Sequence, residues 1–146
     1  MDTENREPES GIAAEVASCV LRVSNLERSL KFYCDVFSCR VLIREADMAL
    51  LLAPNGFQLY VHADRGFRHR DPGTIGVQYL MWATDSESDL ERITQRLKAC
   101  DVAAYSYTQG GVNFVEGCDP DGERVIVAYP SPRQLPREVI AKRLRG

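Results

Sequence analysis

Residues 18–33 (SCVLRVSNLERSLKFY) and 78–93 (QYLMWATDSESDLERI) follow one plan at a spacing of 60 residues. Each begins with an alternating run typical of a strand, continues through polar residues that can cap a helix, and ends in an amphipathic helical pattern. Because an internal repeat decides the architecture of a chain, this pair is the starting point for the fold. It predicts two copies of one structural unit.

Alternation along the two strands separates a core face from an outward face. The predicted core residues are Cys19, Leu21 and Val23 in the first copy and Tyr79, Met81 and Ala83 in the second. Asn25 is the expected cap of the first helix, and either Asp85 or Ser86 caps the second.

Each helical pattern is followed by three short strand-like runs, at residues 40–45, 48–53 and 57–62 and again at 102–108, 112–117 and 124–129. A turn that ends in glycine precedes the last run of each copy, at Gly56 and at Gly122. The order β, α, β, β, β therefore occurs twice. It predicts an α+β fold built from two βαβββ repeats.

The domain boundaries follow from composition. Residues 1–12 are polar and expected to be a disordered tail, residues 13–130 form one domain, and residues 131–146 form a C-terminal helical tail. The first repeat spans about 16–66 and the second about 75–130. In the tail, Val139, Ile140 and Leu144 are expected to dock on the domain.

Charge and hydropathy exclude several classes of partner. The formal net charge is -3, without a basic face on the domain, so nucleic acid is not an expected partner. No apolar run approaches the roughly 18 to 20 residues that cross a bilayer, so no membrane association is expected. The N-terminus MDTENREPES has no signal-peptide pattern, which favours a cytoplasmic location.

Residues 18–37 and the late turn DPDGERVIVAY (119–129) resemble the vicinal oxygen chelate superfamily, which includes glyoxalase I, extradiol dioxygenases, fosfomycin-resistance enzymes and bleomycin-resistance proteins. The resemblance covers roughly residues 16–130. It implies a cup-shaped mixed sheet around a cavity, with the helices on the outside. It also implies a homodimer, with the repeats paired either within one chain or across a swapped dimer.

Metal-dependent members of that superfamily place His or Gln at the start of each first strand and Glu in each last strand. Carried over to this chain, these positions fall on Ser18, Gln78, Tyr60 and Ile126, with Gln58 as the alternative to Tyr60. None is a carboxylate or an imidazole, the groups that hold divalent metals. We therefore expect no metal or other cofactor, with a displaced divalent metal at His62, Gln78 and Gln58 as the alternative.

The resemblance implies a pocket lined by the outward faces of the strands. Its predicted ligand-binding residues are Ser18, Arg22, Gln58, Tyr60, His62, Gln78, Leu80, Trp82, Tyr107 and Ile126. Arg22 favours an anionic group on the ligand, and the aromatic residues favour a flat one. Glu116 and Asp119, near a turn, are expected to be exposed.

Two functions from different classes follow. One is a metal-independent protein that binds or sequesters a small molecule, of the bleomycin-resistance type. The other is a divergent enzyme of the lyase, isomerase or dioxygenase type, with either a displaced metal or a metal-free site in which His62 and Tyr60 are the catalytic candidates.

Overall fold

The computed structural model describes residues 11–71 and 73–145. The predicted disordered tail at 1–12 thus lies almost wholly outside the described residues. The first repeat comprises β1 (Ser18–Val23), α1 (Leu26–Phe37), β2 (Arg40–Arg44), β3 (Met48–Leu52) and β4 (Gln58–Ala63). The second comprises β5 (Leu80–Ala83), α2 (Glu87–Cys100), β6 (Tyr105–Gln109), β7 (Val112–Cys118) and β8 (Arg124–Tyr129), followed by the 3₁₀ helix η2 (Lys142–Arg145).

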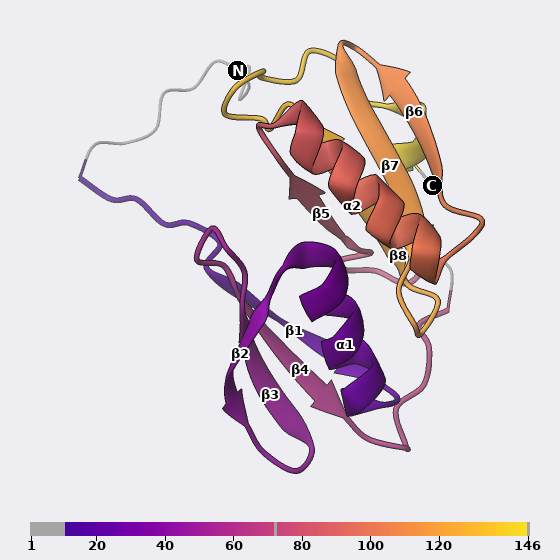
Figure 1. The fold of residues 1–146 in the computed structure, drawn as a ribbon. Coiled ribbons are helices and arrows are strands. Elements are labelled where there is room, and N and C mark those ends of the chain that lie inside the picture. Colours follow the sequence, from indigo (N-terminus) through magenta and orange to yellow (C-terminus); the bar gives the residue numbers. More distant parts are fainter. Residues whose placement is uncertain (1–10, 72, 146) are drawn as a thin grey trace.

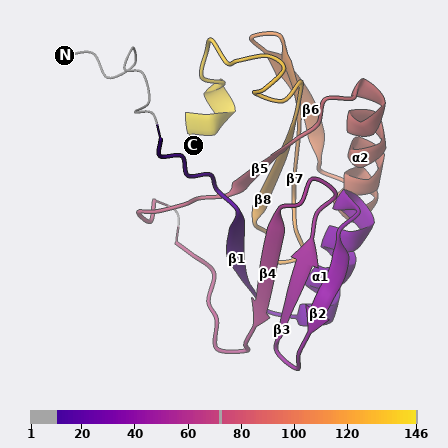
Figure 2. The same cartoon turned by 90° about the vertical axis from the view of Figure 1, so that its left-hand side faces the viewer.

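The two repeats have identical topology. Sheet A has the strand order β1-β4-β3-β2 and sheet B the order β5-β8-β7-β6. In each sheet the first and last strands of the repeat pair in parallel and the other neighbours are antiparallel. Both helices lie on the same side of the two sheets (Figures 1 and 2). The predicted α+β fold of two βαβββ repeats is confirmed.

Both helices begin at polar caps of the kind that the sequence predicts. The Asn25 side chain accepts a hydrogen bond from the Arg28 N–H at 3.0 Å, and the Ser86 hydroxyl accepts one from the Asp89 N–H at 3.2 Å. Each cap satisfies an N–H that has no partner within the helix. Of the two candidates for the second cap, Ser86 is the one observed.

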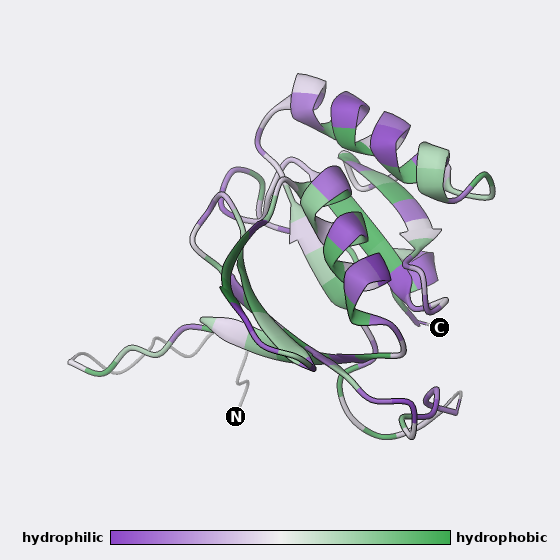
Figure 3. Ribbon diagram, turned by 60° about the horizontal axis from the view of Figure 1, so that its bottom comes forward, coloured by the Kyte–Doolittle hydropathy of each residue, from purple (hydrophilic) through white to green (hydrophobic). Residues whose placement is uncertain are grey.

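The hydrophobic core lies between the helices and the sheets. Leu51, Leu59 and Val61 of sheet A and Val115 and Val127 of sheet B are fully buried against it. Figure 3 shows strands that are mainly hydrophobic and helices that alternate between hydrophobic and hydrophilic residues. We call the side of each sheet that meets the helices its helix face and the other side its open face.

The side chains of β5 lie on the opposite faces of the sheet from those that the sequence predicts. Leu80 and Trp82 pair with Val125 and Val127, which belong to the main core, and both pack against that core. Met81, expected in the core, is 42% exposed. The expectation that Leu80 and Trp82 share a face with Ile126 is therefore wrong. All four residues of this strand are apolar, so alternation could not fix its orientation, whereas the large Trp82 ring gains most from burial.

The turn before β8 joins the two repeats. Asp121 accepts hydrogen bonds from the backbone N–H and the hydroxyl of Ser24, and Arg28 lies 3.4 Å from the same carboxylate. Asp119, expected to be exposed, is buried, and its carboxylate accepts a 2.9 Å hydrogen bond from the Tyr33 hydroxyl. The other oxygen of Asp119 accepts the N–H groups of its own turn. The first helix is thus tied to the second repeat by side chains.

Within the described part of the chain, no helix has the length and hydrophobicity needed to cross a membrane.

Candidate functional site

Five of the ten predicted ligand-binding residues share the open face of sheet A. In the β1/β4 register, Ser18 pairs with Gln58 and Arg22 with His62, while Tyr60 lies between them on the same face. The side chains of Gln58, Tyr60 and His62 are half-buried. Alternation along these two strands therefore placed the residues of the first repeat together as predicted.

Charged groups gather at the His62 end of this face. The His62 Nε2 atom lies 3.6 Å from a carboxylate oxygen of Asp47, and the imidazole meets the Phe67 ring edge-on, with centroids 5.0 Å apart. The Arg22 guanidinium carbon lies 5.0 Å from the centroid of the same Phe67 ring. Sequence alone did not indicate Asp47 or Phe67, because both come from loops whose path depends on the fold.

Leu80 and Trp82 line a different feature, a cleft of about 850 Å³ between the two repeats. Trp82 stacks on Phe37 at the end of α1, with ring centroids 3.9 Å apart and planes 13° from parallel. Phe57, which precedes β4, also lines the cleft. Each repeat therefore supplies part of an aromatic wall.

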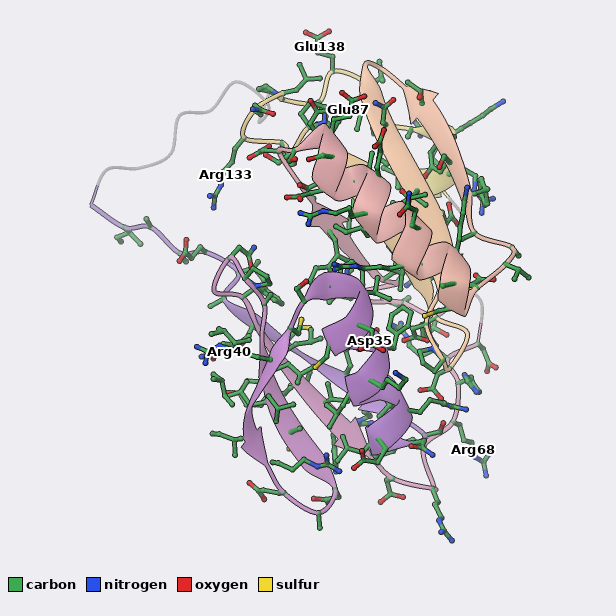
Figure 4. All side chains as sticks on the ribbon, viewed as in Figure 1. Asp35, Arg40, Arg68, Glu87, Arg133 and Glu138 are labelled. Atoms are coloured by element: carbon green, nitrogen blue, oxygen red, sulfur yellow. The ribbon has the colours of Figure 1, made fainter. Side chains whose placement is uncertain are left out.

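Charged side chains surround the opening of this cleft, namely Asp85, Asp89, Arg92, Arg96 and Arg133. Asp89 forms an ion pair with Arg92, Arg96 donates to the Ser38 hydroxyl at 3.1 Å, and Asp85 accepts the backbone N–H of Ser131. Arg133 lines the cleft from the loop after β8, with its side chain extended away from the ribbon (Figure 4). Among the described residues Arg133 forms no direct ion pair, although its charge acts on the carboxylate of Asp85.

Tyr107 and Ile126 lie on the open face of sheet B, beneath the C-terminal tail. Ile126 is fully buried in a second cluster with Phe114, Ala128 and Ala141. In Figure 2 the short helix η2 lies on the side of sheet B away from α2. The chain's own tail therefore covers this part of the predicted pocket.

Gln78 precedes β5 and lines a smaller hollow of about 610 Å³ next to this tail. Its side-chain amide donates hydrogen bonds to the carbonyl oxygens of Thr74 and Gly76, both at 2.7 Å. The amide therefore holds its own loop, and nothing in these contacts brings it to the open face of sheet A.

Glu116 is a buried carboxylate that the sequence analysis placed at the surface. It is 3% exposed and accepts hydrogen bonds from Arg124 and Arg143, both at 2.7 Å, and from the Tyr105 hydroxyl at 3.1 Å. The available signal was period-2 alternation with Val112 and Phe114, which puts Glu116 on the open face opposite Ile126.

The partners of Glu116 set its protonation. Burial acts to raise the pKa of this carboxyl, but the hydrogen bonds from Arg143 and Arg124 outweigh it, so the pKa lies below its ordinary value of 4.5. Glu116 is thus an anion, with Arg124 beside it, on a face that otherwise carries mainly apolar and aromatic side chains. Nearby, burial and the Glu116 charge raise the pKa of Tyr107 to about 12.

The residues at the superfamily's metal positions do not fit a divalent cation. Ser18 and Tyr60 lie on sheet A, Gln78 is bonded within its loop, and Ile126 is buried beneath the tail. No cluster of three His, Cys, Asp or Glu side chains suited to a metal occurs in residues 11–71 and 73–145. A hydroxyl, a phenol, an amide and a hydrocarbon lack the charge and basicity of metal ligands.

Comparison with known structures identifies the same fold elsewhere. The glyoxylase/bleomycin resistance protein/dioxygenase domain from Frankia sp. EAN1pec superposes with a TM-score of 0.68 and 22% identity, over 80% of this chain and 98% of that one. Fosfomycin resistance protein FosX from Listeria monocytogenes gives a TM-score of 0.64 and 14% identity, over 84% and 98%. Lactoylglutathione lyase from Agrobacterium tumefaciens gives 0.60 and 17%, over 84% and 95%.

At these identities the three structures establish the fold alone. No curated protein matches the sequence significantly. A family model does match, and it spans residues 15–127, which include both repeats. The chain therefore belongs to the glyoxalase/bleomycin resistance protein/dioxygenase superfamily.

Proposed function

We propose that this protein binds a small, flat organic anion in the cleft between its two repeats, and that it does so without a metal ion. The observation that carries the proposal is the cleft of about 850 Å³ with its Phe37–Trp82 stack. Ligand pockets of several hundred Å³, apolar inside with a few polar groups at the edge, are typical of small-molecule sites.

The wall and the rim favour different parts of such a ligand. Phe57 and Trp82 offer ring faces and edges to a planar apolar body. Arg133 offers a guanidinium that suits a carboxylate, sulfonate or phosphate. The cleft lining carries three arginines, Arg92, Arg96 and Arg133, against the two carboxylates of Asp85 and Asp89, so its net charge is positive and favours an anion. The aromatic wall and the arginine are sufficient for binding or sequestration of such a ligand, because binding requires no catalytic group.

The test uses 2-naphthoate as a flat anionic probe and 2-naphthol as its neutral counterpart, with dissociation constants measured by calorimetry. The unaltered protein should prefer 2-naphthoate, and Arg133→Ala should remove that preference. Arg40→Ala is the matched control, because Arg40 is an exposed arginine on β2 and does not line the cleft. Binding should persist after dialysis against EDTA.

Two results would contradict this proposal. One is a single tightly held metal ion per chain whose removal abolishes 2-naphthoate binding. The other is equal affinity for the two probes in both the unaltered protein and Arg133→Ala.

The second candidate is an enzyme that uses the open face of sheet A. The observation in its favour is the His62–Asp47 pair, with Tyr60 on the same face and Arg22 beside it. An imidazole held by a carboxylate can move a proton, and an arginine can orient an anionic substrate. Turnover of an anionic carbonyl compound that is lost in His62→Gln and kept in His69→Gln would favour this function over simple binding.

We also infer that the protein is a homodimer. The open face of sheet A carries exposed apolar side chains, including Val20 and Ile43, and nothing in the described residues covers them as the tail covers sheet B. Burial of such a face against a second copy would be favourable. Light scattering should give twice the chain mass of 16.4 kDa, and Val20→Asp should shift it toward a monomer.

A further inference from the structure

On the open face of sheet B, the guanidinium of Arg143 is bound by a carboxylate and an aromatic ring. This side chain approaches Glu116 with two nitrogens, Nη2 at 2.7 Å and Nε at 3.3 Å, from the two carboxylate oxygens. Its central carbon lies 5.6 Å from the Tyr105 ring centroid. A carboxylate combined with an aromatic ring face is the arrangement that binds planar cations.

The wall of this site consists of side chains from the strands of sheet B. Glu116 lies on β7 and is also bonded to Arg124 and Tyr105, which belong to the sheet and not to the tail. Tyr107 stacks on Phe114 with centroids 4.9 Å apart. These side chains all come from strands of one sheet, so their positions are fixed by its register.

The tail, by contrast, is held by few contacts. Arg143 itself is 50% exposed at its side chain, and η2 is a single short turn. Within residues 11–71 and 73–145, and apart from the Glu116 pair, two hydrogen bonds tie η2 to the sheet: the Lys142 N–H donates to Gln109, and Arg124 donates to the Arg143 carbonyl. Ala141 is the buried residue of this segment. Segments with so few buried contacts open locally at low cost.

The docked tail also leaves one buried polar group of the site without a hydrogen bond. Among the described residues, the buried hydroxyl of Tyr107 has no hydrogen-bond partner. A buried polar atom without a partner is unfavourable, so an occupant that reaches this hydroxyl would bind better than the tail does. The observation points to a ligand with a hydrogen-bonding group as well as a positive charge.

We propose that the open face of sheet B is a second ligand site, specific for a flat organic cation such as an amidinium or guanidinium, and that Arg143 occupies it in the absence of ligand. The ligand's cation replaces the Arg143 guanidinium on Glu116, and its planar body lies against Tyr105 and Tyr107. The tail is then displaced from the sheet. This site lies on the opposite side of sheet B from the Trp82 stack, so it is independent of the proposed function.

The test uses full-length protein and benzamidine, a planar amidinium, with the neutral benzamide as its matched control. Because Arg143 competes within the same chain, ligand affinity falls by the fraction of molecules whose site is open. Arg143→Ala should therefore bind benzamidine at least about tenfold more tightly than the unaltered protein. Arg145→Ala, which removes an arginine of the same turn that does not contact Glu116, should leave the affinity unchanged.

The charge requirement is tested in the Arg143→Ala background. Adding Glu116→Gln should abolish the gain in benzamidine affinity, and benzamide should not bind either variant. Equal benzamidine affinity in Arg143→Ala and Arg145→Ala would overturn the proposal. So would equal affinity of Arg143→Ala for benzamidine and benzamide.

A second measurement needs no substitution. Benzamidine in excess over the unaltered protein should speed hydrogen exchange of the Lys142 amide, whose N–H is donated to Gln109 at 2.9 Å in the docked tail. Unchanged exchange at saturating benzamidine would show that the tail does not compete with the ligand. Arg133→Ala should bind benzamidine as the unaltered protein does, which separates this site from the cleft between the repeats.

Discussion

Single residues show where alternation is informative and where it is not. In β1, polar residues alternate with apolar ones, and the predicted faces of Ser18 and Arg22 match the register with Gln58 and His62. In β5 the sequence LMWA offers no polar residue, so the choice of face depends on packing with α1. The stack of Trp82 on Phe37 is a contact between repeats, and a pattern local to one strand does not contain it.

The orientation of β5 gives a direct test at this scale. Trp82→Ala should lower the free energy of unfolding by about 3 kcal/mol, because it removes a large ring stacked in the core. Met81→Ala, one residue away on the open face, should cost less than about 1 kcal/mol. Urea denaturation of both variants measures the difference. A larger loss for Met81→Ala would mean that the strand faces the other way.

Buried charge is harder to predict than buried hydrocarbon. Glu116 lies just before a turn and Asp119 begins it, positions that usually lie in water, yet both are buried. Their burial is possible because partners far away in the chain satisfy them, Arg143 for Glu116 and Tyr33 for Asp119. Such partners are known only once the fold has brought them together.

At the scale of elements, local rules sufficed for helices and turns. The caps at Asn25 and Ser86 and the turn glycines Gly56 and Gly122, with φ angles of 93° and 83°, are all properties of a few adjacent residues. The tail is the exception. Of its three expected docking residues, Leu144 is half-buried but Val139 and Ile140 are mostly exposed, and Ala141 is buried instead.

The cap of α1 provides the test at this scale. Asn25→Ala should lower the free energy of unfolding by about 1 kcal/mol, because the Arg28 N–H loses its acceptor. Asn25→Asp is the matched control, since its carboxylate can accept the same hydrogen bond and should preserve stability. Thermal and urea unfolding report both values. An equal loss in the two variants would show that the cap is not what stabilises this end of the helix.

For the whole molecule, the central feature is the set of contacts that hold the two repeats together. The Phe37–Trp82 stack and the contacts of Asp121 with Ser24 and Arg28 both cross between repeats. The repeat itself could be predicted from the sequence because it consists of local patterns. The contacts that join the copies could not, because they form between residues far apart in the sequence, 97 positions apart for Ser24 and Asp121.

Replacing Asp121 tests this junction. The carboxylate is only 8% exposed and holds Ser24 and Arg28, so Asp121→Ala should lower the free energy of unfolding by about 1 to 2 kcal/mol. Glu123→Ala, two residues along the same turn, should change it by less than about 0.5 kcal/mol. If the two variants are equally stable, the side chain of Asp121 contributes nothing to joining the repeats.

Acid stability is a property of the whole molecule that depends on Glu116. Its pKa in the folded protein is below the ordinary 4.5, so its ionised form stabilises the fold above that pH and the stabilisation is lost as the pH falls through the folded value. Asp119 acts in the opposite direction. Burial raises the pKa of its carboxyl in the folded protein, so protonation of Asp119 stabilises the fold as the pH falls. Single variants are therefore needed to separate the two.

Glu116→Gln should be less stable than the unaltered protein at pH 7, and the difference should shrink as the pH falls below 4.5 and Glu116 becomes protonated in the folded chain as well. Urea midpoints at several pH values measure it. Glu123→Gln removes a carboxylate that takes part in none of these ion pairs, and it should follow the unaltered protein at every pH. The stability difference between Glu116→Gln and the unaltered protein could instead stay constant with pH. The charge of Glu116 would then contribute nothing to stability.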